Sequence, residues 1–166
     1  MQQKHLLLLG VALVSTLSGA QNALTTEDLF EQISPSVWVV RTLDGSGRPL
    51  MQGSAVVIGP GRLITNCHVL RQAKSVTVGR ENVSYGATLE HPDTERDLCQ
   101  LRVANFTAPA VAVTPPEQLR IGARVYAIGT PRGLETTLSD GLLSGLRRDA
   151  QGNLEAIQIT VPLSGG

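Results

Sequence analysis

Thr65-Asn66-Cys67-His68-Val69 ends one apolar run of this sequence, and Asp97-Leu98-Cys99-Gln100-Leu101 begins another. Imidazole exchanges a proton near neutral pH, and a carboxylate can hold an imidazole in one tautomer. The apolar residues after Asp97 place it at the mouth of a buried strand, where an acid would itself be buried. Asp93 is the rival acid, but it follows His91-Pro92 in an expected surface turn and fits a turn cap better.

The segments around these residues have the two-residue period of β-strands. Turn signals such as Asp44-Gly45-Ser46-Gly47 and Gly59-Pro60-Gly61 separate them. The predicted strands are residues 37–40, 54–58, 62–65, 75–78, 87–89 and 98–103. Short strands at this spacing indicate an all-β sandwich or barrel.

The same pattern predicts a short helix before these strands and a second group of strands after them. Residues 25–33 begin with a capping-box pattern, Thr25 with Asp28, and end before Pro35. Residues 107–116 contain three prolines and form the expected connector. Three further strands are predicted over residues 124–128, 136–146 and 154–161. We therefore expect a first unit of strands over residues 21–112 and a second over residues 113–166.

Composition excludes several classes of function. The chain has 14 acidic and 14 basic residues and a formal net charge of zero, so no nucleic-acid partner is indicated. It contains no GxxxxGK[ST], CxxC or HExxH pattern, so we expect no cofactor and no metal. A metal site built from Cys67, His68, His91 and Cys99 lacks the usual ligand spacing.

Residues 1–20 read as a secretory signal peptide. Lys4 and His5 precede an apolar stretch, and Ser18-Gly19-Ala20 offers the small residues of a cleavage site. The apolar stretch is short for a bilayer span, although an uncleaved anchor is the alternative. The sequence therefore predicts a periplasmic or secreted protein with no stable membrane span after cleavage.

Four segments together resemble the HtrA-type branch of the trypsin-fold serine proteases. Besides the two segments around His68 and Asp97, these are Gly53-Ser54-Ala55-Val56-Val57-Ile58 and the stretch from Gly122 to Leu134, which is like the family's first strand of the second barrel. The resemblance implies a trypsin-like double β-barrel with the first barrel complete and the second only half present. It also implies a serine endopeptidase that cleaves peptides or unfolded proteins without a cofactor.

The resemblance assigns His68 as the general base and Asp97 as its orienting carboxylate. It departs from the family at Cys67, where the family most often has alanine. Ser164-Gly165-Gly166 carries the triplet that surrounds the family's nucleophile. The spacing from the strand before it instead favours a serine two positions after Gly166, with a truncated chain and with the Gly166 N–H as an oxyanion-hole donor. Ser164 is the alternative nucleophile.

Cys67 and Cys99 flank the two residues that the resemblance brings together. In an oxidising compartment we expect them to form a disulfide. The alternative is two buried thiols that do not meet.

Two other functions remain open. One is a catalytically inactive relative of the same fold that binds exposed peptide segments in the cell envelope. The other is an envelope β-barrel module unrelated to peptidases. The pairing of His68 with Asp97 disfavours the first, and the ordered set of four segments disfavours the second.

Overall fold

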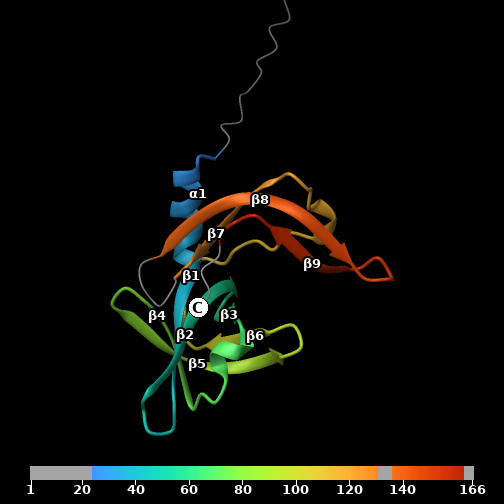
Figure 1. Ribbon diagram of the computed structural model, residues 1–166. Coiled ribbons are helices and arrows are strands. Elements are labelled where there is room, and N and C mark those ends of the chain that lie inside the picture. The colour runs from blue at the N-terminus through green and yellow to red at the C-terminus, as the bar shows by residue number, and fades with distance from the viewer. Residues whose placement is uncertain (1–23, 131–135, 163–166) are drawn as a thin grey trace, which may run out of the picture.

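The computed structural model describes residues 24–130 and 136–162, which form one short helix and two groups of strands (Figure 1). The elements are α1 (Thr26–Ile33), β1 (Val37–Leu43), β2 (Pro49–Gly59), β3 (Arg62–Thr65), β4 (Ser75–Arg80), β5 (Val83–Asp93), β6 (Leu98–Val103), β7 (Arg124–Gly129), β8 (Thr137–Arg148) and β9 (Leu154–Ile159). Three short 3₁₀ helices, η1 (Ser34–Ser36), η2 (Cys67–Leu70) and η3 (Pro116–Gln118), lie between them. The predicted signal peptide, Ser164 and Gly166 lie outside the described residues.

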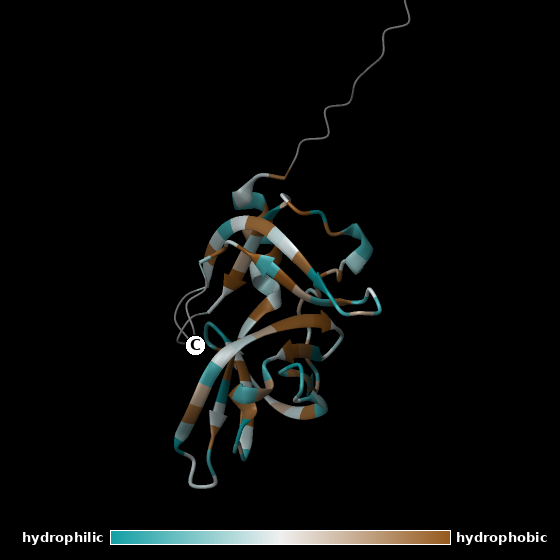
Figure 2. Cartoon of the chain, turned by 45° about the vertical axis from the view of Figure 1, so that its right-hand side comes forward, coloured by the Kyte–Doolittle hydropathy of each residue, from teal (hydrophilic) through white to brown (hydrophobic). Residues whose placement is uncertain are grey.

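The first six strands close into a barrel. Their order around it is β1-β2-β3-β6-β5-β4, every pair is antiparallel, and the pairing of β1 with β4 closes the ring. Figure 2 shows hydrophobic and hydrophilic residues alternating along several strands, as expected where only one face is buried. The sequence left open a sandwich or a barrel, and the structure has the barrel.

The barrel interior is an apolar core with one aromatic cluster. Trp38, Tyr85 and Phe106 pack edge to face, with ring centroids 4.8–5.9 Å apart. Such pairs each contribute about 0.5–1.5 kcal/mol beyond the area that they bury. The aliphatic residues of the core with no exposed surface are Val40, Ala55, Val57, Leu63, Val78 and Leu101.

The remaining strands form a three-stranded antiparallel sheet in the order β7-β8-β9, which lies over the barrel (Figure 1). The buried Thr130, just after β7, donates its backbone N–H to the Ser54 hydroxyl on β2 at 3.0 Å. The connector is tied to the barrel by a hydrogen bond from the Val111 N–H to the Val57 carbonyl, at 2.9 Å. The protein therefore has the trypsin-like all-β fold, with a complete first barrel and a partial second sheet.

Helix α1 begins as the sequence predicts. Thr25 and Asp28 form a reciprocal capping box, which satisfies two backbone N–H groups at the start of the helix. The Thr26 hydroxyl lies 3.2 Å from the Tyr126 hydroxyl, so the helix contacts the second sheet. Within residues 24–130 and 136–162, no helix is long and apolar enough to cross a bilayer.

Several strands are longer than the sequence indicates, and β2 and β5 differ most from the predicted bounds. Strand β2 begins at Pro49 rather than Ser54, because its first residues pair with β1 beyond the barrel core and are exposed. Strand β5 continues through His91 and Pro92 to Asp93, so the expected turn at these residues is wrong. The pairing with β6 shifts register between Leu89 and His91, and Pro92 then lies opposite Cys99.

Candidate active site

His68 lies on η2, the single turn that follows β3. The turn is fixed to the barrel by Val69, whose side chain is buried in the core. Gly53 on β2 leaves the space for it, because a Cβ atom at Gly53 would lie 2.7 Å from the Val69 Cγ2 atom. The Thr65 hydroxyl, at the end of β3, donates to the Ser54 carbonyl at 2.8 Å. The lack of a side chain at Gly53 and the backbone carbonyl of Ser54 therefore set the position of the turn that carries the histidine.

Asp97 lies immediately before β6 and has an unusual backbone conformation. Its φ of 54° is in the left-handed region, which costs a residue other than glycine about 1–2 kcal/mol and which Asp and Asn tolerate best. Its carbonyl accepts hydrogen bonds from the Cys67 N–H at 3.3 Å and from the Asn66 amide at 3.1 Å. These contacts compensate for the backbone cost and direct the Asp97 side chain toward η2.

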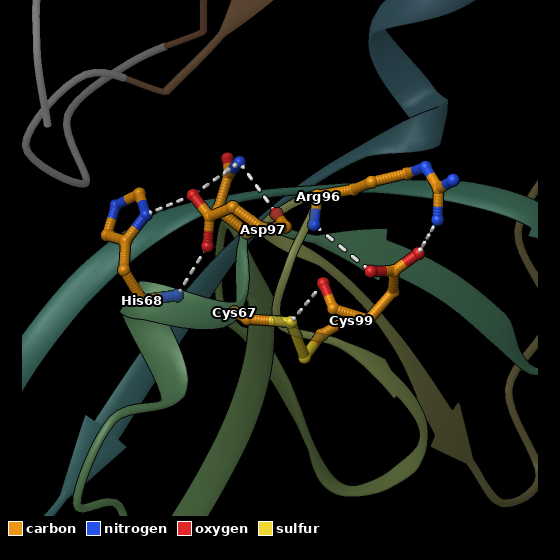
Figure 3. The surroundings of a disulfide bond; sticks show 7 residues. Cys67, His68, Arg96, Asp97 and Cys99 are labelled. Atoms are coloured by element: carbon orange, nitrogen blue, oxygen red, sulfur yellow. Dashed lines mark hydrogen bonds and ion pairs between the residues drawn. A yellow bond between two sulfur atoms is a disulfide. The ribbon is translucent and has the colours of Figure 1, made fainter. Parts of the chain in front are cut away.

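The carboxylate of Asp97 contacts His68 at two points (Figure 3). Its Oδ1 accepts the backbone N–H of His68 at 2.8 Å, and its Oδ2 lies 2.6 Å from the imidazole Nδ1. Because an ionised carboxylate can only accept, the hydrogen between them belongs to Nδ1. In the neutral imidazole this leaves Nε2 with a free lone pair, as a general base requires.

The same contacts keep Asp97 ionised. The hydrogen bond from the His68 side chain, followed by that from the His68 backbone N–H, lowers the pKa of the Asp97 carboxyl group. The side chains of His68 and Asp97 are 47% and 41% exposed, respectively. The expectation of a buried acid is therefore wrong, because Asp97 stands at the rim of the barrel, outside the apolar core that β6 enters.

Asp93 does not reach His68. It ends β5 and accepts the backbone N–H of Arg96 at 3.0 Å and the Arg96 guanidinium at 2.9 Å. The pKa of Asp93 is lowered, first by the backbone hydrogen bond from Arg96 and then by its side chain. Asp93 thus caps the β5–β6 turn, and its charge is already paired.

Cys67 and Cys99 form a disulfide directly beneath the His68–Asp97 pair (Figure 3). Their Cα atoms are 5.0 Å apart and 32 positions apart in sequence. A cross-link closing a loop of this length stabilises the folded chain by about 3–4 kcal/mol on the chain-entropy estimate. Both sulfurs are bonded to each other, so these cysteines offer no thiolate to a metal.

His91 lies on the exposed face of β5, opposite Gln100. Within residues 24–130 and 136–162, no group of three His, Cys, Asp or Glu side chains could hold a metal ion.

Asn66 is a site residue that the sequence pattern included without giving it a role. Its amide donates to Asp97 at two atoms, the carbonyl at 3.1 Å and the carboxylate Oδ2 at 3.2 Å. Its place just before a short helical turn would have predicted a capping side chain, so no local signal in the sequence pointed to the contact with Asp97.

A closed six-stranded barrel with a His–Asp pair at its rim, followed by a second antiparallel sheet, is the arrangement of trypsin-fold peptidases. Comparison with known proteins gives the same class. Residues 53–166 match the family described as trypsin-like peptidase domain, so the chain belongs to that family.

Its relatives are HtrA- and Deg-type serine proteases. The chain is 34% identical over 140 residues to Protease Do-like 1, chloroplastic, from Arabidopsis thaliana, a match that covers 76% of this chain and 32% of the relative. It is 33% identical over 113 residues to the periplasmic pH-dependent serine endoprotease DegQ of Escherichia coli (strain K12), covering 64% of this chain and 24% of DegQ. Among solved structures, Deg5 superposes with a TM-score of 0.69 at 27% identity, covering 83% of this chain and 73% of Deg5. The matches span about a third or less of the length of these two curated relatives.

Proposed function

We propose that this chain provides the His–Asp half of a serine endopeptidase that cleaves peptide bonds through an acyl-enzyme. The observation that carries the proposal is the double contact of the Asp97 carboxylate with His68, at 2.8 Å to the backbone N–H and 2.6 Å to Nδ1. A single hydrogen bond would be enough to pair the charge of the carboxylate, but here the carboxylate contacts both the backbone and the ring of one histidine. An imidazole that must accept a proton at Nε2 needs both its tautomer and its direction fixed.

In this mechanism the His68 Nε2 takes the proton of a serine hydroxyl as that oxygen attacks the scissile carbonyl. The imidazolium then gives the proton to the leaving amine, and the acyl-enzyme forms. In the second half of the reaction a water molecule attacks the acyl-enzyme, and His68 again takes a proton and returns it, this time to the serine oxygen. Asp97 stays ionised throughout and stabilises the charge on the ring. Its lowered pKa supports this role, because the carboxylate remains an acceptor at any pH where the imidazole can act as a base.

The nucleophile that we propose is a serine two positions after Gly166, with Ser164 as the alternative. The spacing of the apolar loop that follows β9 supports the first assignment, since a shorter loop would pull Ser164 away from His68. In the same assignment the Gly166 backbone N–H donates to the oxyanion. All of these residues lie outside the described ranges, so the assignment depends on the sequence pattern.

The proposed substrates are peptide segments or unfolded proteins, and the proposed location is outside the cytoplasm, in the periplasm or secreted. The Cys67–Cys99 disulfide supports this location, because such bonds persist in oxidising compartments. The name of DegQ places that relative in the periplasm and supports the same location here.

A fluorophosphonate probe tests the proposal on the protein encoded by the complete reading frame. The wild-type protein should be labelled on one serine, identified by mass mapping, and should hydrolyse an unfolded casein substrate. His68→Ala should abolish both, whereas Asp93→Asn, which alters the neighbouring turn only, should retain both. A folded wild-type protein with neither labelling nor hydrolysis would favour the inactive peptide-binding relative. Labelling of Ser164 would make that residue the nucleophile.

A further inference from the structure

Asn66 occupies the N-cap position of η2 but does not cap it. Asparagine is favoured at this position because its side chain can accept a hydrogen bond from a backbone N–H one turn ahead. Here Asn66 has the extended backbone of an N-cap residue, with φ −74° and ψ 138°, and its side chain makes no capping hydrogen bond. The side chain therefore has another use.

Asp97 satisfies the start of η2 instead. The first two N–H groups of the turn both donate to it: Cys67 N–H to its carbonyl at 3.3 Å and His68 N–H to its Oδ1 at 2.8 Å. The carboxylate is thus both the cap of the turn and the partner of the imidazole. A small rotation of the Asp97 side chain would disturb both interactions.

The Asn66 amide contacts Asp97 at the two places that fix this rotation. One nitrogen, Nδ2, lies 3.1 Å from the Asp97 carbonyl and 3.2 Å from Oδ2, the oxygen that binds the imidazole. Because the same donor joins the backbone and the side chain of one residue, it restricts the torsion angles between them. It also uses a lone pair of Oδ2 that water could otherwise occupy, since the Asp97 side chain is 41% exposed.

We propose that Asn66 is a positioning residue, which fixes the Asp97 carboxylate so that its Oδ2 stays on the Nδ1 of His68. The expected effect of Asn66 on kcat rests on the proposed peptidase function. The expected effect on the geometry of the His68–Asp97 pair does not. The competing explanation is that Asn66 only stabilises the β3–η2 junction. The two explanations differ in what a serine at position 66 would do.

The experiment compares Asn66→Ala and Asn66→Ser in the protein encoded by the complete reading frame. Serine is as good an N-cap as asparagine, but its shorter side chain cannot reach Asp97 as the amide does. If Asn66 is a positioning residue, both variants should lower kcat by a similar factor, up to about 100-fold, with KM changed by less than about 2-fold. Asn105→Ala is the control, since Asn105 is an exposed asparagine that follows the opposite end of β6 from Asp97.

A second measurement follows the pair directly. A proton held between an imidazole Nδ1 and a carboxylate gives a proton NMR signal at unusually low field, and His68→Ala identifies it by its loss. We expect Asn66→Ala and Asn66→Ser to weaken or shift this signal and Asn105→Ala to leave it unchanged. A circular dichroism melt confirms that each variant is folded. Should Asn66→Ala fail to fold, Asn66→Ser provides the same comparison.

The outcomes separate this inference from the proposed function. Recovery of kcat and of the low-field signal in Asn66→Ser would overturn the positioning role, as would wild-type values in Asn66→Ala. A wild-type protein without peptidase activity, in which the low-field signal still depends on Asn66, would overturn the proposed function and leave the positioning role intact.

Discussion

The carboxylate of Asp97 holds His68 by its backbone and by its ring at once, with Oδ1 on the backbone N–H and Oδ2 on Nδ1. The two residues come from different strand connections, β3 to η2 and β5 to β6, and the pairing of β3 with β6 brings these connections together. The disulfide between Cys67 and Cys99 joins η2 to the start of β6 beside them. The His–Asp pair is therefore built on a cross-linked and hydrogen-bonded corner of the first barrel.

Loss of either His68 or Asp97 should abolish most of the proposed peptidase activity. We expect His68→Ala and Asp97→Asn each to lower kcat by about 10⁴-fold, since the first removes the base and the second removes the acceptor that selects its tautomer. Peptide hydrolysis under saturating substrate measures the effect. Asp93→Asn is the matched control, because it neutralises an aspartate in the adjacent turn. A larger loss in Asp93→Asn than in Asp97→Asn would mean that the acid is misassigned.

Gly53→Ala should displace the turn that carries His68. The added methyl group would lie 2.7 Å from the Val69 Cγ2 atom, so Val69 and η2 must move. We expect a loss of stability of about 1–3 kcal/mol, the usual cost of overpacking, together with reduced activity. Urea denaturation and hydrolysis assays measure the two effects.

The double variant Gly53→Ala/Val69→Ala tests the reason for that loss. Removing the Val69 γ-methyl groups relieves the clash, so the double variant should recover part of the activity lost in Gly53→Ala, although the lost core packing keeps it less stable than wild type. If the two substitutions are simply additive in both assays, the close contact is not what makes glycine necessary at position 53.

The disulfide should be present in the isolated protein and should contribute to its stability. We expect titration under denaturing, non-reducing conditions to find no free thiol from Cys67 or Cys99. Replacing both cysteines by alanine should lower the free energy of unfolding by about 3–4 kcal/mol, since the unfolded chain regains the freedom of a 32-residue separation. Two free thiols per chain would contradict the first expectation. Cys67→Ala alone is the less suitable variant, because it leaves an unpaired thiol at Cys99.

The contribution of Asp97 to stability should disappear in acid. The pKa of Asp97 is lowered from its ordinary value of 3.8 in the folded protein, mainly by the His68 hydrogen bonds. As pH falls, the unfolded chain binds the proton first, so the stabilisation is complete above pH 3.8 and is lost as pH drops through the lower folded value. The stability difference between wild type and Asp97→Asn should thus shrink as the pH falls below 3.8. Urea midpoints measured across this range test the expectation, and a difference that grows with acidity would contradict it.

Much of this protein follows from local sequence. The capping box of Thr25 and Asp28, the two-residue alternation of the strands and the glycine-bounded turns are local interactions, so they are visible without the fold. The sequence pattern also selected Asp97 over Asp93, and the structure brings Asp97, and not Asp93, to His68. The strand ends were less accurate at β2 and β5, because exposed strand extensions have no buried face and therefore no alternating signal.

Tertiary structure decided what depends on distant partners. Whether six strands close into a barrel depends on the pairing of β1 with β4, a contact that no local pattern encodes. The partial exposure of Asp97 and the hydrogen bond that the Asn66 amide donates to it also appear only when β3 and β6 lie side by side. Composition and periodicity report how each residue relates to its neighbours in sequence. The geometry of the His68–Asp97 pair depends instead on hydrogen bonds and packing between segments that only the fold brings together.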